Sequence, residues 1–225
     1  MMTLLAIDTS TERATVALAV GDALFHDEKH SVREHAMCLL PMVEGLLTAA
    51  SLSLNQLDGI VFGCGPGSFT GLRITCSIAK ALAYAHDLPL YPVSSLAAIA
   101  NEVYYTATDL QPDGHVFAML DARMQQVYWA DFTHINDSPI EQVSAAQDVV
   151  WTSATPLIIA GVGLDAYAPF WPQSIQALAL TPRLVYPDAR AMIRVVRAGG
   201  VQAVSAAEAL PVYVRELHFN QVEGK

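Results

Sequence analysis

Charged side chains are scarce in this sequence, and positively charged ones are the scarcest. Asp, Glu, Lys and Arg make up only 15% of the 225 residues, and 12 Lys and Arg face 22 Asp and Glu, which gives a formal net charge of -10. A surface that binds RNA needs clustered Lys and Arg to neutralise phosphates. If the protein serves an RNA pathway, we therefore expect another subunit to hold most of the RNA.

The sequence also lacks cysteine pairs and long apolar runs. Its cysteines, Cys38, Cys64 and Cys76, form no C-x-x-C pair, so we expect small buried residues rather than disulfides or a zinc site. No uncharged apolar run reaches 18 residues, and Asp8 interrupts the first apolar stretch before it reaches signal-peptide length. These absences predict a cytoplasmic protein with no membrane partner.

Apolar residues are abundant instead. They make up 53% of the chain, and the mean hydropathy of +0.34 is high for a soluble monomer. We therefore expect an apolar surface that a protein partner covers.

The first half of the chain alternates between strand and helix patterns. Short apolar runs predict strands, and apolar residues at helical spacing predict helices. In chain order we predict strands over 4–8, 14–20 and 23–28, a helix over 31–50 that bends at Pro41, a strand over 59–63, a helix over 68–86 and a strand over 90–94. The order is βββαβαβ.

A second copy of this order begins near residue 115. A strand expected over 116–120 ends in Asp121, as the first strand of the chain ends in Asp8. Further elements are predicted as strands over 126–133 and 157–160, a Gly161-Val162-Gly163 turn and a helix over 190–198.

The second copy is rich in proline between residues 156 and 187, and proline interrupts helices. We therefore predict a reduced C-terminal lobe over 104–205, following an N-terminal lobe over 1–103. The segment 206–225 is expected to pack back on the N-terminal lobe.

Two such lobes, each with an aspartate after its first strand, indicate the α/β actin-like (ASKHA) fold, whose hairpins cradle nucleotide phosphates. The turn in that class resembles D-x-G-[ST], whereas this chain has Asp8-Thr9-Ser10-Thr11-Glu12 and Asp121-Ala122-Arg123. Without glycine the backbone amides cannot approach a phosphate closely, and Glu12 adds negative charge. We interpret Asp8, Ser10 and Asp121 as relics of a nucleotide site. A nucleotide-dependent enzyme of the actin and Hsp70 class is the alternative.

Other catalytic patterns are missing. The glycine-rich segment 63–73 has no G-K-[ST] and is not a phosphate-binding Walker loop. We expect a turn with positive φ whose Ser68 or Thr70 caps the following helix. His30 and His35 are five residues apart, which does not place two metal ligands on one helix face, and neither H-E-x-x-H nor G-x-S-x-G occurs. We therefore assign no catalytic residue and no metal site.

The helices of the first lobe have more apolar faces than one sheet can cover. Each carries a second line of small or flexible residues beside its main apolar stripe: Cys38, Met42, Gly45 and Ala49 on the first helix, and Leu72, Cys76, Ala79 and Ala83 on the second. We interpret these lines as a helix-to-helix interface with another subunit. The alternative is that the second lobe or the C-terminal segment covers them.

Five motifs together resemble one family. They are DTST (8–11), REHA..LLP (33–41), GPGSFTGLRI (65–74), DARM..VYWA (121–130) and PVYVR (211–215). The chain is similar, across nearly its whole length, to the TsaB (YeaZ) family of tRNA threonylcarbamoyladenosine biosynthesis proteins.

The resemblance implies a non-catalytic subunit. It would bind and activate the catalytic paralogue TsaD through the first-lobe helices, with TsaE as a further partner, in threonylcarbamoylation of adenosine 37 in tRNAs that read codons beginning with A. ATP and metal would belong to the partner subunits, tRNA would be contacted only indirectly, and the chain alone would form a homodimer. A peptidase, suggested by an older label of the family, is a further alternative.

Carried over to this chain, the partner interface falls on the two helices. The expected contacts are Arg33, His35, Cys38, Met42, Gly45 and Ala49 on the first helix and Phe69, Leu72, Arg73, Cys76 and Ala79 on the second.

Overall fold

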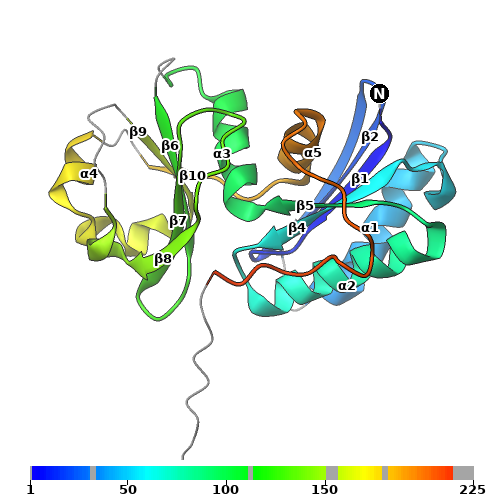
Figure 1. Cartoon of the computed structure of the whole chain (residues 1–225), viewed down its shortest axis with the longest axis horizontal. Helices are drawn as coiled ribbons and strands as arrows, with labels where there is room; N and C mark the ends of the chain where they lie inside the picture. Colours follow the sequence, from blue (N-terminus) through cyan, green and yellow to red (C-terminus); the bar gives the residue numbers. More distant parts are fainter. Residues whose placement is uncertain (1, 31–33, 111–113, 151–156, 179–181, 215–225) are drawn as a thin grey trace, which may run out of the picture.

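Two five-stranded sheets divide the molecule into two lobes that lie side by side (Figure 1). The structure is a computed structural model that describes residues 2–30, 34–110, 114–150, 157–178 and 182–214. No helix in these ranges is long and apolar enough to cross a membrane.

The N-terminal sheet has the strand order β3-β2-β1-β4-β5. Strand β1 pairs antiparallel with β2 and parallel with β4, and β5 lies parallel beside β4. The strands are β1 (Leu4–Asp8), β2 (Arg13–Val20), β3 (Ala23–His30), β4 (Gly59–Gly65) and β5 (Leu90–Ser94).

The C-terminal sheet repeats this plan with the order β8-β7-β6-β9-β10. Its strands are β6 (His115–Asp121), β7 (Gln126–Phe132), β8 (Gln142–Ala145), β9 (Leu157–Val162) and β10 (Arg183–Leu184). Strand β6 pairs antiparallel with β7 and parallel with β9, as β1 does with β2 and β4. The duplicated α/β actin-like fold expected from the sequence is confirmed, with Asp8 and Asp121 at equivalent strand ends.

Alternation along β1 explains how one strand serves two cores. Leu5 and Ile7 face helices α1 (His35–Ala49) and α2 (Phe69–His86), whereas Leu4 and Ala6 face the opposite side of the sheet. Because both faces are covered, all five residues of β1 are buried, and the strand is read in the sequence as a continuous apolar run.

Helix α3 (Ser95–Thr106) follows β5 directly and was not predicted from the sequence. It packs on β6, β9 and β7 of the C-terminal sheet, with Leu96, Ile99 and Val103 in that core. The expected lobe boundary at residue 103 therefore falls inside a helix that belongs to both lobes.

Helix α5 (Ala189–Arg197) likewise packs on the sheet of the other lobe. It comes after the C-terminal sheet in sequence but packs on β1, β2 and β4 of the N-terminal sheet, where Met192 and Ile193 are buried. It also contacts α3, because Arg194 Nε donates to Asn101 Oδ1 at 2.9 Å and pairs with Glu102. Each sheet is thus covered on one face by the last helix of the other lobe (Figure 1).

The second lobe is reduced, as predicted. Where α2 follows β4 in the first lobe, β9 is followed by short turns and the six-residue helix α4. The short elements of the described chain are η1 (Leu54–Gln56), η2 (Ala146–Asp148), η3 (Leu164–Ala166), η4 (Ala168–Phe170) and α4 (Gln173–Leu178).

The C-terminal segment, which we define as residues 203–214, returns to the first lobe along α2 (Figure 1). Val204 exchanges backbone hydrogen bonds with Leu90, and the Val212 amide donates to Cys64 O at 2.7 Å. Cys76 Sγ and Lys80 Nζ on α2 donate to Ala209 O. Residues 204, 209 and 212 of this segment thus contact the first lobe, and residues 215–225 lie outside the described ranges.

The cysteines lie in the first lobe and are buried there, as the sequence predicts. Cys38, Cys64 and Cys76 are free and buried. Burial raises the pKa of the Cys64 thiol to about 12, so this thiol stays protonated at neutral pH.

Replacing Ser94 by Ala should destabilise the chain more than replacing Ser68 by Ala. Ser94 Oγ accepts the Leu96 and Ala97 amides at the start of α3 and also donates to the partly buried carboxylate of Glu141 from the other lobe, whereas Ser68 provides one helix cap. We expect a loss of about 2 kcal/mol against about 1 kcal/mol in urea unfolding. Equal losses would mean that the Glu141 contact contributes nothing.

Candidate functional site

A cleft of about 920 Å³ lies between the lobes, at the ends of β1 and β6. It is the place where the actin-like plan would put a nucleotide. Its lining comes from both lobes: Ser10, Thr11, Glu12, Gly67, Ser68, Phe69, Thr70, Leu120, Asp121, Ala122, Arg123, Tyr128, Val162, Gly163, Leu184, Tyr186 and Tyr213.

Asp8 does not reach this cleft. Its side chain is fully buried, and Oδ1 accepts hydrogen bonds from the Ser10 amide at 2.9 Å and the Ser10 hydroxyl at 2.7 Å. Oδ2 has no partner in the described chain and packs on Gly63, where a Cβ would lie only 1.8 Å away. Burial raises the pKa of Asp8 to about 6, although the Ser10 hydrogen bonds lower it. Asp8 and Ser10 thus bond to each other instead of presenting an open ligand site.

The turn after Asp8 is closed by the start of α2. Thr9 Oγ1 donates to Gly71 O at 2.8 Å, and a Cβ at Gly71 would lie 1.8 Å from Thr9 O, so glycine is required for this approach. The Ser68 amide donates to Ser10 O at 2.7 Å, and Ser68 Oγ accepts from the Gly71 amide. The predicted capping role of Ser68 is confirmed, and the Ser68 amide is not free for an anion.

Asp121 differs from Asp8 because it does line the cleft. Its Oδ1 accepts from Tyr167 Oη at 2.6 Å and from the Arg123 amide at 2.7 Å, and Oδ2 lies 3.3 Å from Arg123 Nη1. Burial, reinforced by the Asp121 contact, raises the pKa of Tyr167 to about 12. The residues Arg123, Met124 and Gln125 all have positive φ, which is costly for side chains other than glycine.

The opposite wall of the cleft is also acidic. Glu12 Oε1 accepts from Tyr186 Oη at 2.9 Å, and the Arg13 guanidinium lies 4.8 Å from the Tyr186 ring centroid. Two carboxylates, Glu12 and Asp121, therefore face a cleft to which the described chain contributes one arginine, Arg123. This charge pattern disfavours a nucleotide phosphate.

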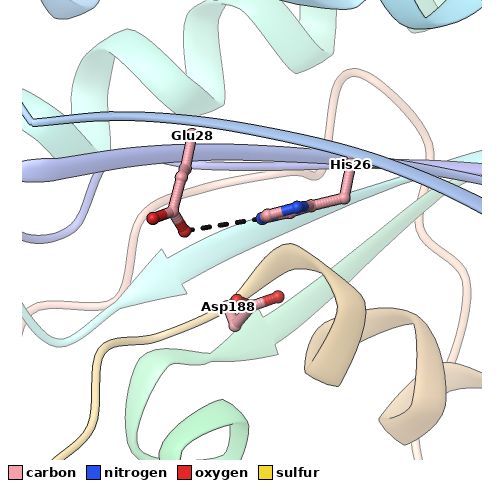
Figure 2. Close-up of side chains that lie close together, drawn as sticks. All are labelled: His26, Glu28 and Asp188. Atoms are coloured by element: carbon pink, nitrogen blue, oxygen red, sulfur yellow. Dashed lines mark ion pairs between the residues drawn. The ribbon is translucent and has the colours of Figure 1, made fainter.

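A second cluster joins His26 and Glu28 on β3 to Asp188 before α5 (Figure 2). One possible ligand atom from each lies within 4.8 Å of the others, and His26 Nε2 is 3.5 Å from Glu28 Oε2. Asp188 is 2% exposed, and Glu28 is only partly buried.

Arginines already neutralise this cluster. Arg13 pairs with Glu28 at 2.9 Å and with Asp188 at 3.3 Å, and Arg190 pairs with Asp188 at 2.8 Å. Burial alone would raise the pKa of Asp188, but the Arg190 hydrogen bonds and both guanidiniums together lower it. We therefore assign the cluster to holding α5 on the N-terminal sheet, since a metal cation would have to displace two guanidiniums.

The histidines weighed as metal ligands have separate surroundings. His30 Nε2 lies 3.9 Å from Glu28 and its ring contacts Tyr186, whereas the buried His35 places Nε2 3.3 Å from Glu12 O. The described chain does not combine them in one ligand set.

The strongest candidate for function is the exposed side of the helix pair, which we call the α1–α2 face. It carries small or apolar side chains with few charges, and Met37 is 76% and Phe69 45% exposed. Its members are Ala36, Met37, Leu40, Pro41, Glu44, Gly45, Thr48 and Ala49 on α1 and Phe69, Thr70, Arg73, Ser77, Ala81, Tyr84 and Ala85 on α2.

Several residues expected on this face lie in the core instead. On α1, His35, Cys38 and Met42 are buried against the sheet, because the core stripe of the helix is wider than one line of residues. On α2, Leu72, Cys76 and Ala79 are buried because the C-terminal segment covers that flank, the alternative left open by the sequence. Their expected position on an open flank is therefore corrected.

The remaining expected contacts are exposed. Gly45, Ala49, Phe69 and Arg73 belong to the α1–α2 face, whereas Arg33 lies outside the described residues. Sequence reasoning missed Met37, which lies opposite the core stripe in the helical period, and Leu40, which lies at the edge of this stripe and is exposed.

Comparison with known proteins finds relatives whose similarity extends along the whole chain. A family model described as "TsaD: tRNA N6-adenosine threonylcarbamoyltransferase" matches residues 28–157, more than half of the chain. The chain is 32% identical to the tRNA threonylcarbamoyladenosine biosynthesis protein TsaB of Haemophilus influenzae, over 100% of this chain and 98% of that one. It is 40% identical to TsaB of Escherichia coli, over 58% of this chain and 55% of that one.

A solved structure is also similar. YeaZ from Pseudomonas aeruginosa superposes with a TM-score of 0.82 at 35% identity, over 95% of this chain and 100% of that one.

Asp8→Asn should flatten the pH dependence of stability. Because the folded pKa of about 6 exceeds the ordinary value of 3.8, the native state holds the proton more tightly, and stability falls as pH rises through this window. Asn removes that loss, which is roughly 3 kcal/mol for a shift of about two pKa units. Urea unfolding at pH 4 and pH 8 measures it.

A pH slope that survives Asp8→Asn unchanged would contradict the assignment of this slope to Asp8.

Proposed function

Since the chain belongs to the TsaB (YeaZ) family, we propose that it is a non-catalytic subunit of the machinery that threonylcarbamoylates adenosine 37 of tRNAs reading codons that begin with A. In this role it binds and activates the catalytic paralogue TsaD, and TsaE joins the complex. The chain acts in the cytoplasm.

One observation carries the binding role: the apolar, nearly uncharged α1–α2 face. Exposed patches of this kind mark protein interfaces. Small residues such as Gly45, Ala49 and Ala81 permit close approach of a partner helix, and Met37 and Leu40 supply apolar area. The same face serves a homodimer when the partner is absent.

The state of the cleft supports the non-catalytic part of the proposal. The carboxylate of Asp8 is buried against Gly63, and the Ser68 amide donates its hydrogen bond to Ser10 O. The carboxylates of Glu12 and Asp121 face the cleft. The chain therefore carries no cofactor of its own, and ATP and metal belong to the partner subunits.

The charge of the chain supports an indirect relation to tRNA. A net charge of -10 repels phosphates. In the described part of the chain, most arginines pair with carboxylates, as Arg13, Arg183 and Arg194 do. The tRNA is therefore held mainly by other subunits.

A reconstituted modification assay tests the proposal. The adenylate-forming enzyme, TsaD and TsaE from the same source are combined with substrate tRNA, with and without this chain. Modification should require the chain, while the purified chain alone turns over neither ATP nor the adenylate. Unchanged modification without it would refute the proposed role, and turnover by the chain alone would refute its non-catalytic nature.

Gly45→Arg should abolish association with TsaD without unfolding the chain. A Cβ at Gly45 meets nothing within 4 Å, so the new side chain enters solvent, and replacing a helical glycine should stabilise α1 by up to about 1 kcal/mol. In the complex, however, the arginine would be buried without a counterion. Binding is measured by calorimetry, and folding by thermal unfolding.

Gly200→Arg is the matched control. Gly200 is exposed beyond the end of α5, and a Cβ there also meets nothing within 4 Å. This variant should bind as the unsubstituted chain does. Retained binding by Gly45→Arg would show that the partner uses another surface.

A further inference from the structure

One wall of the cleft between the lobes is an apolar row that crosses three strands. Leu120 on β6 is paired directly with Tyr128 on β7 and with Val162 on β9, so the three side chains point to the same face of the C-terminal sheet. All three line the cleft. The Tyr128 ring contacts no other aromatic ring among the described residues. The row therefore presents an apolar surface and an aromatic ring to a ligand.

Glu12 supplies a hydrogen-bond acceptor from the N-terminal lobe. Its Oε1 accepts the Tyr186 hydroxyl at 2.9 Å, which holds the carboxylate in place, and its Oε2 takes part in no hydrogen bond within the described residues. Asp121 differs, because its Oδ1 accepts from Tyr167 Oη and the Arg123 amide and its Oδ2 lies beside the Arg123 guanidinium. Glu12 is therefore the carboxylate that can accept hydroxyl groups of a ligand.

The charges in and beside the cleft nearly cancel. Asp121 and Arg123 form an ion pair at 3.3 Å, which leaves Glu12 as the unpaired charge of the lining. The Arg73 guanidinium lies 3.8 Å from the centroid of the Phe69 ring, which also lines the cleft, and pairs with no carboxylate within the described ranges. A strongly charged ligand of either sign thus gains little from this site.

We infer that the cleft binds a neutral nucleoside, with its base against the apolar row and its ribose hydroxyls at Glu12. A nucleobase is flat and stacks on an aromatic side chain such as Tyr128. A ribose presents two adjacent hydroxyls, and a carboxylate is the group that accepts a ribose hydroxyl in dinucleotide-binding folds. The volume of about 920 Å³ lies within the range of small-molecule sites.

The start of α2 explains why the ligand lacks a phosphate. The Ser68 amide donates to Ser10 O, so it is not available to an anion, and the turn after Asp8 contains no glycine. The inference is independent of the proposed function, because it concerns the cleft and adds no catalytic step. Loss of nucleoside binding and failure of the modification assay are therefore separate results.

Calorimetric titration of the purified full-length chain tests the inference with adenosine as the probe. Adenosine should bind with a dissociation constant below about 1 mM. The analogue 2′-deoxyadenosine should bind about tenfold more weakly, because it leaves the Glu12 carboxylate with one hydroxyl fewer. Adenosine 5′-monophosphate and ribose should each bind at least about tenfold more weakly than adenosine, the first because of its charge and the second because it lacks a base.

Two variants separate the ribose contact from the base contact. Glu12→Gln removes the charged acceptor, so it should bind adenosine and 2′-deoxyadenosine with nearly equal affinity. Tyr128→Leu keeps the row apolar but removes the aromatic ring. It should weaken both ligands by about fivefold and keep the preference for adenosine.

Glu44→Gln is the matched control, because Glu44 is exposed on α1 and does not line the cleft. It should bind as the unsubstituted chain does, and thermal unfolding should show all variants folded. Four results would each overturn the inference: no saturable binding of adenosine below about 1 mM, the monophosphate binding as tightly as adenosine, ribose binding as tightly as adenosine, or a Glu12→Gln chain that keeps the full preference for adenosine over its deoxy analogue.

Discussion

The exchange of one helix between the lobes is the constraint on which the rest of the molecule depends. Helix α3 covers the C-terminal sheet and α5 covers the N-terminal sheet, so neither sheet has two covered faces without a helix from the other half of the chain. The network of Arg13, Asp188 and Arg190 holds the start of α5 in place, and Arg194 links α5 to α3. The lobes are thus joined through shared cores as well as through connecting loops.

This exchange also leaves the opposite face of the N-terminal sheet to α1 and α2 alone. Their inner sides pack on β1 and β2, the C-terminal segment closes one flank of α2, and the outer side remains open. The cleft and the α1–α2 face of this chain therefore differ in charge. The cleft is acidic and Asp8 is buried behind it, whereas the α1–α2 face carries few charges.

The parts of the fold that follow from local pattern could be predicted from the sequence. Continuous apolar runs identified β1 and β4, the repeated aspartates identified the duplication, and the glycine-rich turn indicated the cap of α2. Helix α3 was not predicted because it begins directly after β5 with no separating turn, although Ser94 and Ser95 supply a capping signal.

Contacts between distant segments could not be predicted in the same way. Periodicity shows that two flanks of α2 are apolar, but the flank that includes Cys76 is covered by Ala209, more than a hundred residues later in the chain. The same limit applies to α5, because its apolar stripe does not identify the sheet that it covers, which is the N-terminal one. Periodicity also does not give the width of the buried stripe of α1, which includes Cys38 and Met42.

The order in which the ribosome makes these elements has a consequence of its own. The apolar side of β1, β2 and β4 that α5 covers is complete once β4 emerges, yet α5 ends at Arg197. At typical elongation rates of roughly 5 to 20 residues per second, this surface waits on the order of ten seconds for its cover. We therefore expect the nascent chain to expose this apolar surface to chaperones during that time, and a chain truncated before α5 to be degraded.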